Sequence, residues 1–320
     1  MNDTATYIQV LKAHYDPTHT TAIRNAFARN AKRRFTELAL VVAEAILKQD
    51  CFGLKKESMI IQQMNPPAYR SFAFLRDSEK VEAFMQWLQD QVNKGVLELR
   101  QFRQIGQAIE YAWTDMYILD SYKRGIVRAR YELKRAGLDV PSVDDSGGID
   151  AVLNGTPFHL DRVGLLFTRV YSDLKGITDA MDAQISRILS QGMIDGDGPA
   201  LLARKLVAAI NGTGAGDLGI TDIIGRFIPA KRRAEILART EIIRAHHLAT
   251  IQEYRNWGLE GVRVQAEWST AGDDRVCERC QPLEGKIFTL DEIEDKIPLH
   301  PQCRCIALPY IKELEKYYNK

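Results

Sequence analysis

The chain has 320 residues, of which 45% are hydrophobic and 27% are charged, with a formal net charge of +1. This length and composition are typical of a globular protein with two domains, and they exclude a disordered chain. Because the net charge is almost zero, any contact with nucleic acid would have to come from local basic patches. The most apolar stretch, residues 38–47, is too short to span a bilayer, and the first residues lack signal-peptide regions, so we expect no membrane contact.

The N-terminal part is predicted to be helical, because its apolar residues recur at helical spacing. This pattern predicts a helix over residues 21–48, a second from about residue 77, and a long third helix over about residues 98–136. Pro66-Pro67 marks an irregular segment between the first two. The prediction is therefore a helical N-terminal domain over residues 1–140.

Two basic patches lie on these predicted helices. The first comprises Arg24, Arg29, Lys32, Arg33 and Arg34, and no acidic residue interrupts it. The second includes Arg124, Arg128 and Arg130. Such patches can bind DNA phosphates or an acidic protein surface, but solvated helix faces have the same composition. The sequence leaves these three interpretations open.

The C-terminal part begins after a predicted linker over residues 141–158, which is rich in glycine and short polar residues. Residues 159–258 are predicted to form a helical C-terminal domain, with helices over about 160–192, 199–210 and 229–257. Apolar and polar residues then alternate from Val262 through Trp268, which predicts a strand. A second short strand over residues 306–310 and a helix over 311–318 complete a small β-containing module over residues 259–320, so the expected fold is mainly α.

Four of the five cysteines lie within this module. Cys277 and Cys280 form one pair of possible metal ligands, and His300, Cys303 and Cys305 follow about twenty residues later. Two such pairs at this spacing indicate a zinc clip. Because the cysteines share one motif, a reduced compartment with zinc is favoured over a secreted disulfide scaffold or an accidental cluster of reduced cysteines.

The five candidate ligands exceed the four positions of a tetrahedral zinc site. We favour Cys277, Cys280, His300 and Cys303, with Cys305 as the alternative to His300. With all positions filled by protein, the zinc is structural. A catalytic zinc would need an open position and a nearby general base, and the acidic residues at 291–295 look like solvated loop charges. We therefore expect no enzymatic activity.

The C-terminal residues resemble the Mu protein F-like family, which comprises head-morphogenesis proteins of tailed bacteriophages. The resemblance rests on an ordered set of residues spread over about 160–310: Ala238, Arg239, Thr240, Glu241, Ala245, Tyr254, Gly258, Trp268, Asp274, Cys277, Cys280, Leu283, Gly285, His300, Cys303 and Cys305. The chain departs from the family at His247, where asparagine is often found. The N-terminal half is similar to members with an extra helical domain.

The resemblance implies a minor capsid protein, made in the host cytoplasm and located in the phage head. Such proteins associate with the portal protein and with the major capsid or scaffolding protein, and they assist head assembly. For Arg239, Glu241 and Trp268 it implies a structural motif, in which a helix packs against the zinc module. The alternative is a zinc-containing protein, delivered with the genome, that binds double-stranded DNA or processes nucleic acid.

Overall fold

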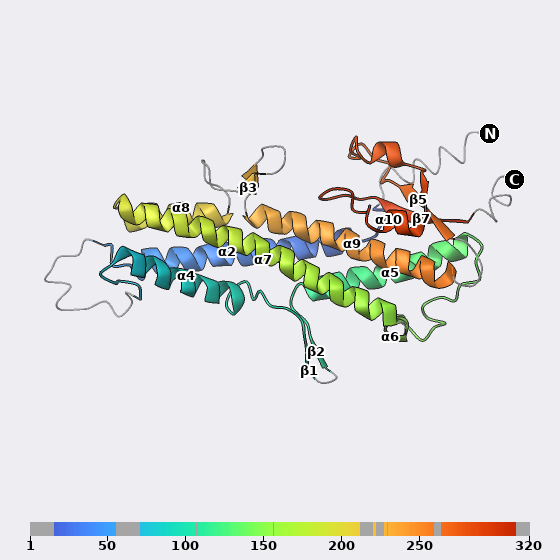
Figure 1. The fold of residues 1–320 in the computed structure, drawn as a ribbon, viewed down its shortest axis with the longest axis horizontal. Coiled ribbons are helices and arrows are strands. Elements are labelled where there is room, and N and C mark those ends of the chain that lie inside the picture. Colours follow the sequence, from blue (N-terminus) through green and yellow to red (C-terminus); the bar gives the residue numbers. More distant parts are fainter. Residues whose placement is uncertain are drawn as a thin grey trace. The chain divides into compact units, whose positions relative to one another are not determined.

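The computed structural model describes residues 16–55, 71–105, 108–155, 157–211, 220–221, 227–228, 230–258 and 264–311. These residues form a mainly helical protein with a small three-stranded antiparallel sheet near the C-terminus, which confirms the predicted fold class. Figure 1 shows these elements as a ribbon, with labels where there is room.

The helices of the N-terminal part follow the predicted periodicity with one exception. Helix α2 (Thr21–Leu47) and helix α4 (Asp77–Asn93) begin where the sequence predicts. The predicted helix over residues 98–136 is wrong in its first third, where strands β1 (Arg103–Ile105) and β2 (Ala108–Glu110) form an antiparallel hairpin. Helix α5 (Asp115–Arg135) begins only where the Asp115 carboxylate accepts a hydrogen bond of 2.7 Å from the Ala112 N–H. Such a side-chain contact competes with an earlier helix start.

The helices of the C-terminal part match their predicted ranges closely. They are α7 (Pro157–Ile194), α8 (Pro199–Asn211) and α9 (Ala230–Gly258). A short helix that was not predicted, α6 (Ile149–Gly155), lies inside the predicted linker and buries Val152 and Leu153. Strands β3 (Ile220–Thr221) and β4 (Phe227–Ile228) form a second small hairpin. The predicted C-terminal helix lies almost wholly outside the described residues.

The chain divides into two compact units, each built from separate stretches of sequence. Unit 1 comprises Met1–Phe27, Phe102–Val170 and Ile236–Lys320, and unit 2 comprises Ala28–Gln101 and Tyr171–Glu235. Helices α2, α7 and α9 each contribute residues to both units. The domain boundaries drawn from the sequence stay a prediction.

Unit 2 has a core of aromatic side chains beside aliphatic ones. The rings of Phe52, Phe72, Phe84 and Trp87 lie with their centroids 5.2 to 6.0 Å apart. Phe84 is fully buried, as is Leu38 of α2. Aromatic pairs at these distances contribute stability beyond the burial of their apolar area. Hydrophobic packing therefore stabilises this unit.

The small sheet of unit 1 has the strand order β6-β5-β7. Strand β5 (Val264–Ser269) pairs with β7 (Ile306–Ile311) along its whole length and with the two-residue β6 (Ile287–Phe288). Helix α10 (Leu290–Glu294) follows β6 and begins with a capping box made by Thr289 and Glu292. We refer to residues 264–311, which contain these elements, as the metal module.

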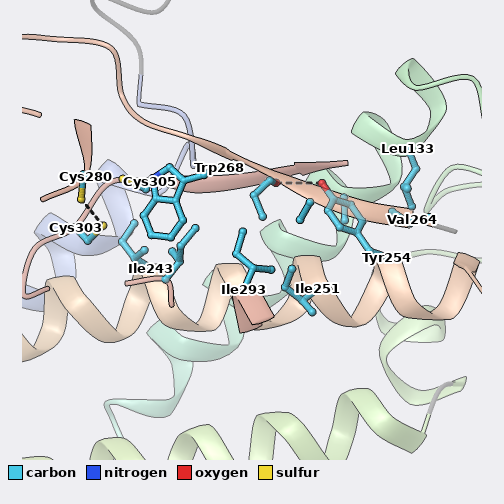
Figure 2. Packing of buried hydrophobic residues seen from close by; sticks show 14 of the residues in the cluster. Leu133, Ile243, Ile251, Tyr254, Val264, Trp268, Cys280, Ile293, Cys303 and Cys305 are labelled. Carbon is cyan, nitrogen blue, oxygen red and sulfur yellow. Dashed lines mark hydrogen bonds between the residues drawn. The ribbon is translucent and has the colours of Figure 1, made fainter. Parts of the chain in front are cut away.

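The metal module packs on helix α9. Figure 2 shows Trp268 of β5 and Ile293 of α10 facing Ile243 and Ile251 of α9, and Trp268 is fully buried. The Tyr254 hydroxyl of α9 donates a hydrogen bond of 3.2 Å to the carbonyl of Ala307 in β7. Three cysteines lie at the edge of the same hydrophobic cluster: Cys280, Cys303 and Cys305.

Candidate metal centre

The candidate ligands lie at one end of the β5–β7 ladder. Ser269 at the end of β5 pairs with Ile306 at the start of β7, so the segment after one strand meets the segment before the other. Within the first segment, the N–H of Cys280 donates to the carbonyl of Cys277 at 3.0 Å, which makes a tight turn. The N–H of Cys303 donates to the carbonyl of His300 at 3.1 Å in the second. These turns point the donors of both segments toward each other.

The five donors form two overlapping groups that share Cys280. Cys277, Cys280 and His300 form the first group, and Cys280, Cys303 and Cys305 form the second, each with its ligand atoms within 4.8 Å of one another. The Nε2 atom of His300 lies 3.2 Å from Cys277 Sγ and 3.1 Å from Cys280 Sγ. The sulfurs of Cys280 and Cys303 lie 3.9 Å apart (Figure 2), and all five cysteines of the chain are free thiols.

These distances fit a tetrahedral metal ion. With zinc–sulfur bonds of about 2.3 Å and zinc–nitrogen bonds of about 2.05 Å, neighbouring donors lie about 3.8 Å apart for two sulfurs and about 3.6 Å for sulfur and nitrogen. The observed sulfur–sulfur separation of 3.9 Å agrees closely, and the two sulfur–nitrogen separations are shorter by about half an ångström. A cavity of about 30 Å³ lies beside Cys277, Cys280, His300 and Cys305, which is room for one ion.

His300 is oriented as a metal ligand would be. Its Nδ1 lies 2.9 Å from the carbonyl oxygen of Pro301, an atom that can only accept a hydrogen bond. Nδ1 therefore carries the hydrogen, and Nε2 presents its lone pair to the thiols. Fixing the tautomer through a backbone carbonyl is the usual arrangement around a metal-binding histidine.

The thiols hold a charge that favours a cation. A hydrogen bond from the Cys305 thiol lowers the pKa of Cys303 to about 5. Burial, together with the charge of Cys303, raises the pKa of Cys280 to about 12, and the same neighbour raises the pKa of Cys305. One thiolate therefore prevents its neighbours from ionising. A divalent cation removes that repulsion, because its charge stabilises several thiolates together.

The Arg239–Glu241 motif of helix α9 directly contacts the segment that carries His300, Cys303 and Cys305. Arg239 donates to the side-chain oxygen of Gln302 at 3.1 Å, and the N–H of Gln302 donates to the Thr240 hydroxyl at 3.1 Å. Gln302 lies between His300 and Cys303 and has a positive φ of 63°, a strained conformation that these contacts hold. Arg239 and Thr240 thus fix the ligand segment against helix α9.

Glu241 and Trp268 are buried in the support of the module. The Glu241 carboxylate is 2% exposed and pairs with Arg169 and Arg244, each at 3.2 Å. The Trp268 ring packs edge-on against Phe288 with centroids 6.3 Å apart. These contacts are those of packing residues.

One residue that positions the ligands was missed from the sequence. Asp273 accepts hydrogen bonds of 2.7 and 2.5 Å from both terminal nitrogens of Arg304, which lies between Cys303 and Cys305. The Asp273 carboxylate also pairs with Arg275, and these contacts hold its pKa well below the ordinary value. The residues that carry the family resemblance include the adjacent Asp274 and not Asp273. Asp273 ties the two ligand segments together.

The basic patches predicted from the sequence are largely engaged within the chain. Arg24 and Arg130 are buried, and Arg24 pairs with Asp16 at 3.3 Å. The others make four further ion pairs, namely Lys32 with Glu235, Arg33 with Glu37, Arg34 with Glu98, and Arg128 with Glu132. Arg124 donates to the carbonyl of His19, and Arg29 is exposed. The structure does not gather Arg24, Arg33, Arg128 and Arg130 on one exposed face, so contact with DNA stays a prediction.

Arg130 belongs to a buried polar network that the sequence did not reveal. It pairs with Glu253 at 2.8 Å, and the other oxygen of that carboxylate lies 2.7 Å from His159 Nε2. Tyr122 donates to His159 Nδ1 at 3.0 Å. The partners are up to 123 residues apart in sequence, which is why spacing could not show them. The network satisfies its own buried charges and is a packing feature.

The C-terminal part of the chain is similar to a known protein family. Residues 183–308 match the model of the family described as Phage Mu protein F like protein. The match confirms the predicted resemblance over less than half of the chain, and it includes the Arg239–Glu241 motif and all five donors. The chain matches no curated protein and no solved structure. Among the described residues no helix is long and apolar enough to cross a membrane.

Proposed function

We propose that the chain is a minor head protein of a tailed bacteriophage, a structural component of the virion without enzymatic activity. The family match over residues 183–308 is the observation that carries this proposal, because that family suggests a role in phage head morphogenesis. The protein would be made in the host cytoplasm and incorporated into the head as it assembles. Its proposed partners are the portal protein and the major capsid or scaffolding protein.

The metal in this proposal is zinc, held for a structural purpose. Thiol and imidazole donors at tetrahedral distances suit zinc better than magnesium or calcium, which prefer oxygen ligands. Cys277, Cys280, His300 and Cys303 would hold it, with Cys305 as the alternative to His300. With that many protein donors, every position of a four-coordinate ion is filled, and the ion contributes folding free energy to the module.

The function is tested in assembled particles. Proheads that carry a tagged copy of the chain are dissociated stepwise, and the portal protein and capsid protein are followed in the fractions that contain the tag. We expect the chain to remain with the portal after the shell has dissociated. If it is absent from purified proheads, or if it is found only in host extracts bound to nucleic acid, the alternative of a DNA-binding protein replaces this proposal.

The metal is tested separately on the purified chain. We expect elemental analysis of protein prepared under reducing conditions to give about one zinc per chain. His300→Ala and Cys305→Ala, made singly, distinguish the two candidates for the fourth position, because only loss of a true ligand lowers the zinc content. A folded protein with no metal and five titratable thiols would contradict the proposal.

A further inference from the structure

We propose that helices α4 and α7 of unit 2 form a docking groove for a basic amphipathic helix of a partner protein. A cavity of about 640 Å³ lies between residues 77–89 of α4 and residues 186–194 of α7. Its lining includes four apolar residues, Val81, Met85, Met193 and Ile194, and two small polar ones, Ser186 and Ser190. The inference goes beyond the proposed function and does not depend on it.

The spacing of the lining residues indicates that the occupant is helical. On α4, the residues Asp77, Val81, Met85 and Gln89 follow one another at intervals of four, and on α7 Ser186, Ser190 and Ile194 do the same. Rows of this spacing form ridges along a helix, and the groove between two ridges accepts the ridge of another helix. From Asp77 to Gln89 the row is about 18 Å long, or between three and four turns.

The composition of the groove suits a close and adaptable contact. The two serines are small, so a helix backbone can approach α7 closely. Met85 and Met193 have flexible side chains that can adapt to the shape of an incoming apolar residue. Ile194 is 78% exposed, which leaves an aliphatic side chain at the mouth of the groove uncovered.

The charge of the groove selects the kind of partner. Its charged lining residues are two exposed acids, namely Glu82 and Asp77, and Asp77 pairs with Lys80 at 2.8 Å. Helix α4 carries two further acids, Glu79 and Asp90, and one lysine. This charge repels DNA phosphates, and a symmetric contact between two copies would place acid against acid. A partner helix with an apolar stripe flanked by lysine or arginine would pack its stripe on the apolar lining residues and pair its cations with the acids.

The proposal is tested with two labelled model peptides and the full chain. One is a fourteen-residue leucine–lysine peptide with leucine at helical spacing, and the other has glutamate in place of every lysine. We expect the lysine peptide to bind, as measured by fluorescence anisotropy, and the glutamate peptide to bind at least tenfold more weakly. Hydrogen exchange should show protection of residues 77–89 and 186–194 when the lysine peptide is bound. Failure of the lysine peptide to bind, or protection of other residues, would overturn the proposal.

Variants of exposed residues distinguish the groove from general stickiness. Ile194→Ser and Glu82→Arg should each weaken binding of the lysine peptide about tenfold. The matched controls are Leu75→Ser, which removes another exposed aliphatic side chain, and Asp90→Arg, which reverses an acid of α4 outside the groove; both should leave binding unchanged. Equal weakening by variants and controls would overturn the proposal. So would a stable dimer of the chain that Ile194→Ser dissociates, because the groove would then be a contact between copies.

Discussion

The metal module and the core of unit 2 differ in the side chains that fill them. Unit 2 gathers four neighbouring aromatic rings, of which Phe52 and Phe84 are buried and Phe72 and Trp87 are half-buried. The module has three short strands and one short helix, and Trp268 is its single large buried aromatic side chain among the described residues. At the end of its sheet, thiols and an imidazole occupy the place where further apolar residues would be expected. Small elements with little apolar area generally gain more from a cross-link than long helices do, and the proposed metal would supply one here.

Metal removal should give the largest difference in stability between the two regions. Cys280→Ala removes the donor that both groups of ligands share, so we expect loss of the metal and of stable structure in residues 264–311. Zinc binding contributes on the order of 10 kcal/mol in small zinc modules, more than the module can replace. Hydrogen exchange measures the effect, and unit 2 should keep its protection. Cys51→Ala, which removes a buried thiol of unit 2, is the control and should retain the metal. An unchanged module in Cys280→Ala would refute the comparison.

A cavity made by mutation in the aromatic core should have the opposite effect, lowering the stability of unit 2 without loss of the metal. Phe84→Ala removes a fully buried ring and is expected to lower the free energy of unfolding of unit 2 by about 3–5 kcal/mol. Metal content should stay at the level of the unmodified chain, because the ligands do not contact this ring. Chemical denaturation together with elemental analysis tests both halves of this expectation. Loss of metal in Phe84→Ala would show that the two regions are not independent.

The pH dependence of unit 2 should reflect Asp182. Burial raises the pKa of this carboxyl to about 6, against opposition from a hydrogen bond with Gln89 and from Lys175, and with support from Asp179. Because the folded state binds the proton more tightly than the unfolded state, stability should fall as the pH rises from about 4 to about 6 and then remain lower. Asp182→Asn should remove this slope and stabilise the protein at pH 7 by up to about 3 kcal/mol. A slope that persists in the variant would assign it to another group.

The weakest expected effect concerns the support of the ligands. Asp273→Asn breaks the paired contact with Arg304 but leaves all five donors in place. Loss of such a support typically lowers metal affinity by about 10- to 100-fold, and competition with a chelator measures this. Asp274→Asn is the matched control, because it changes the adjacent acid that the sequence favoured. Equal affinities for the two variants would contradict the role assigned to Asp273.

The sequence predicted those features that depend on local periodicity or spacing. Helices α2, α7, α8 and α9 could be predicted because their apolar residues repeat over several turns. The clustering of the four C-terminal cysteines with His300 could be predicted because thiol pairs at that spacing are rare. The β1–β2 hairpin was missed because its apolar residues also fit a helical repeat. Neither the choice of Asp273 over Asp274 nor the pairing of Arg130 with Glu253 could be predicted, since each depends on where a distant segment lies.

Because each unit is built from separate stretches of sequence, unit 2 is completely translated before unit 1 and can fold first. All stretches of unit 2 have been translated once residue 235 is made, whereas unit 1 needs strand β7, which ends at Ile311. Compact units generally fold as they emerge from the ribosome, so unit 2 can form first while β5 still has its edge toward β7 unpaired. A nascent chain that stops before residue 306 would therefore expose Trp268, and chaperones or proteases would encounter it before it could enter an assembly.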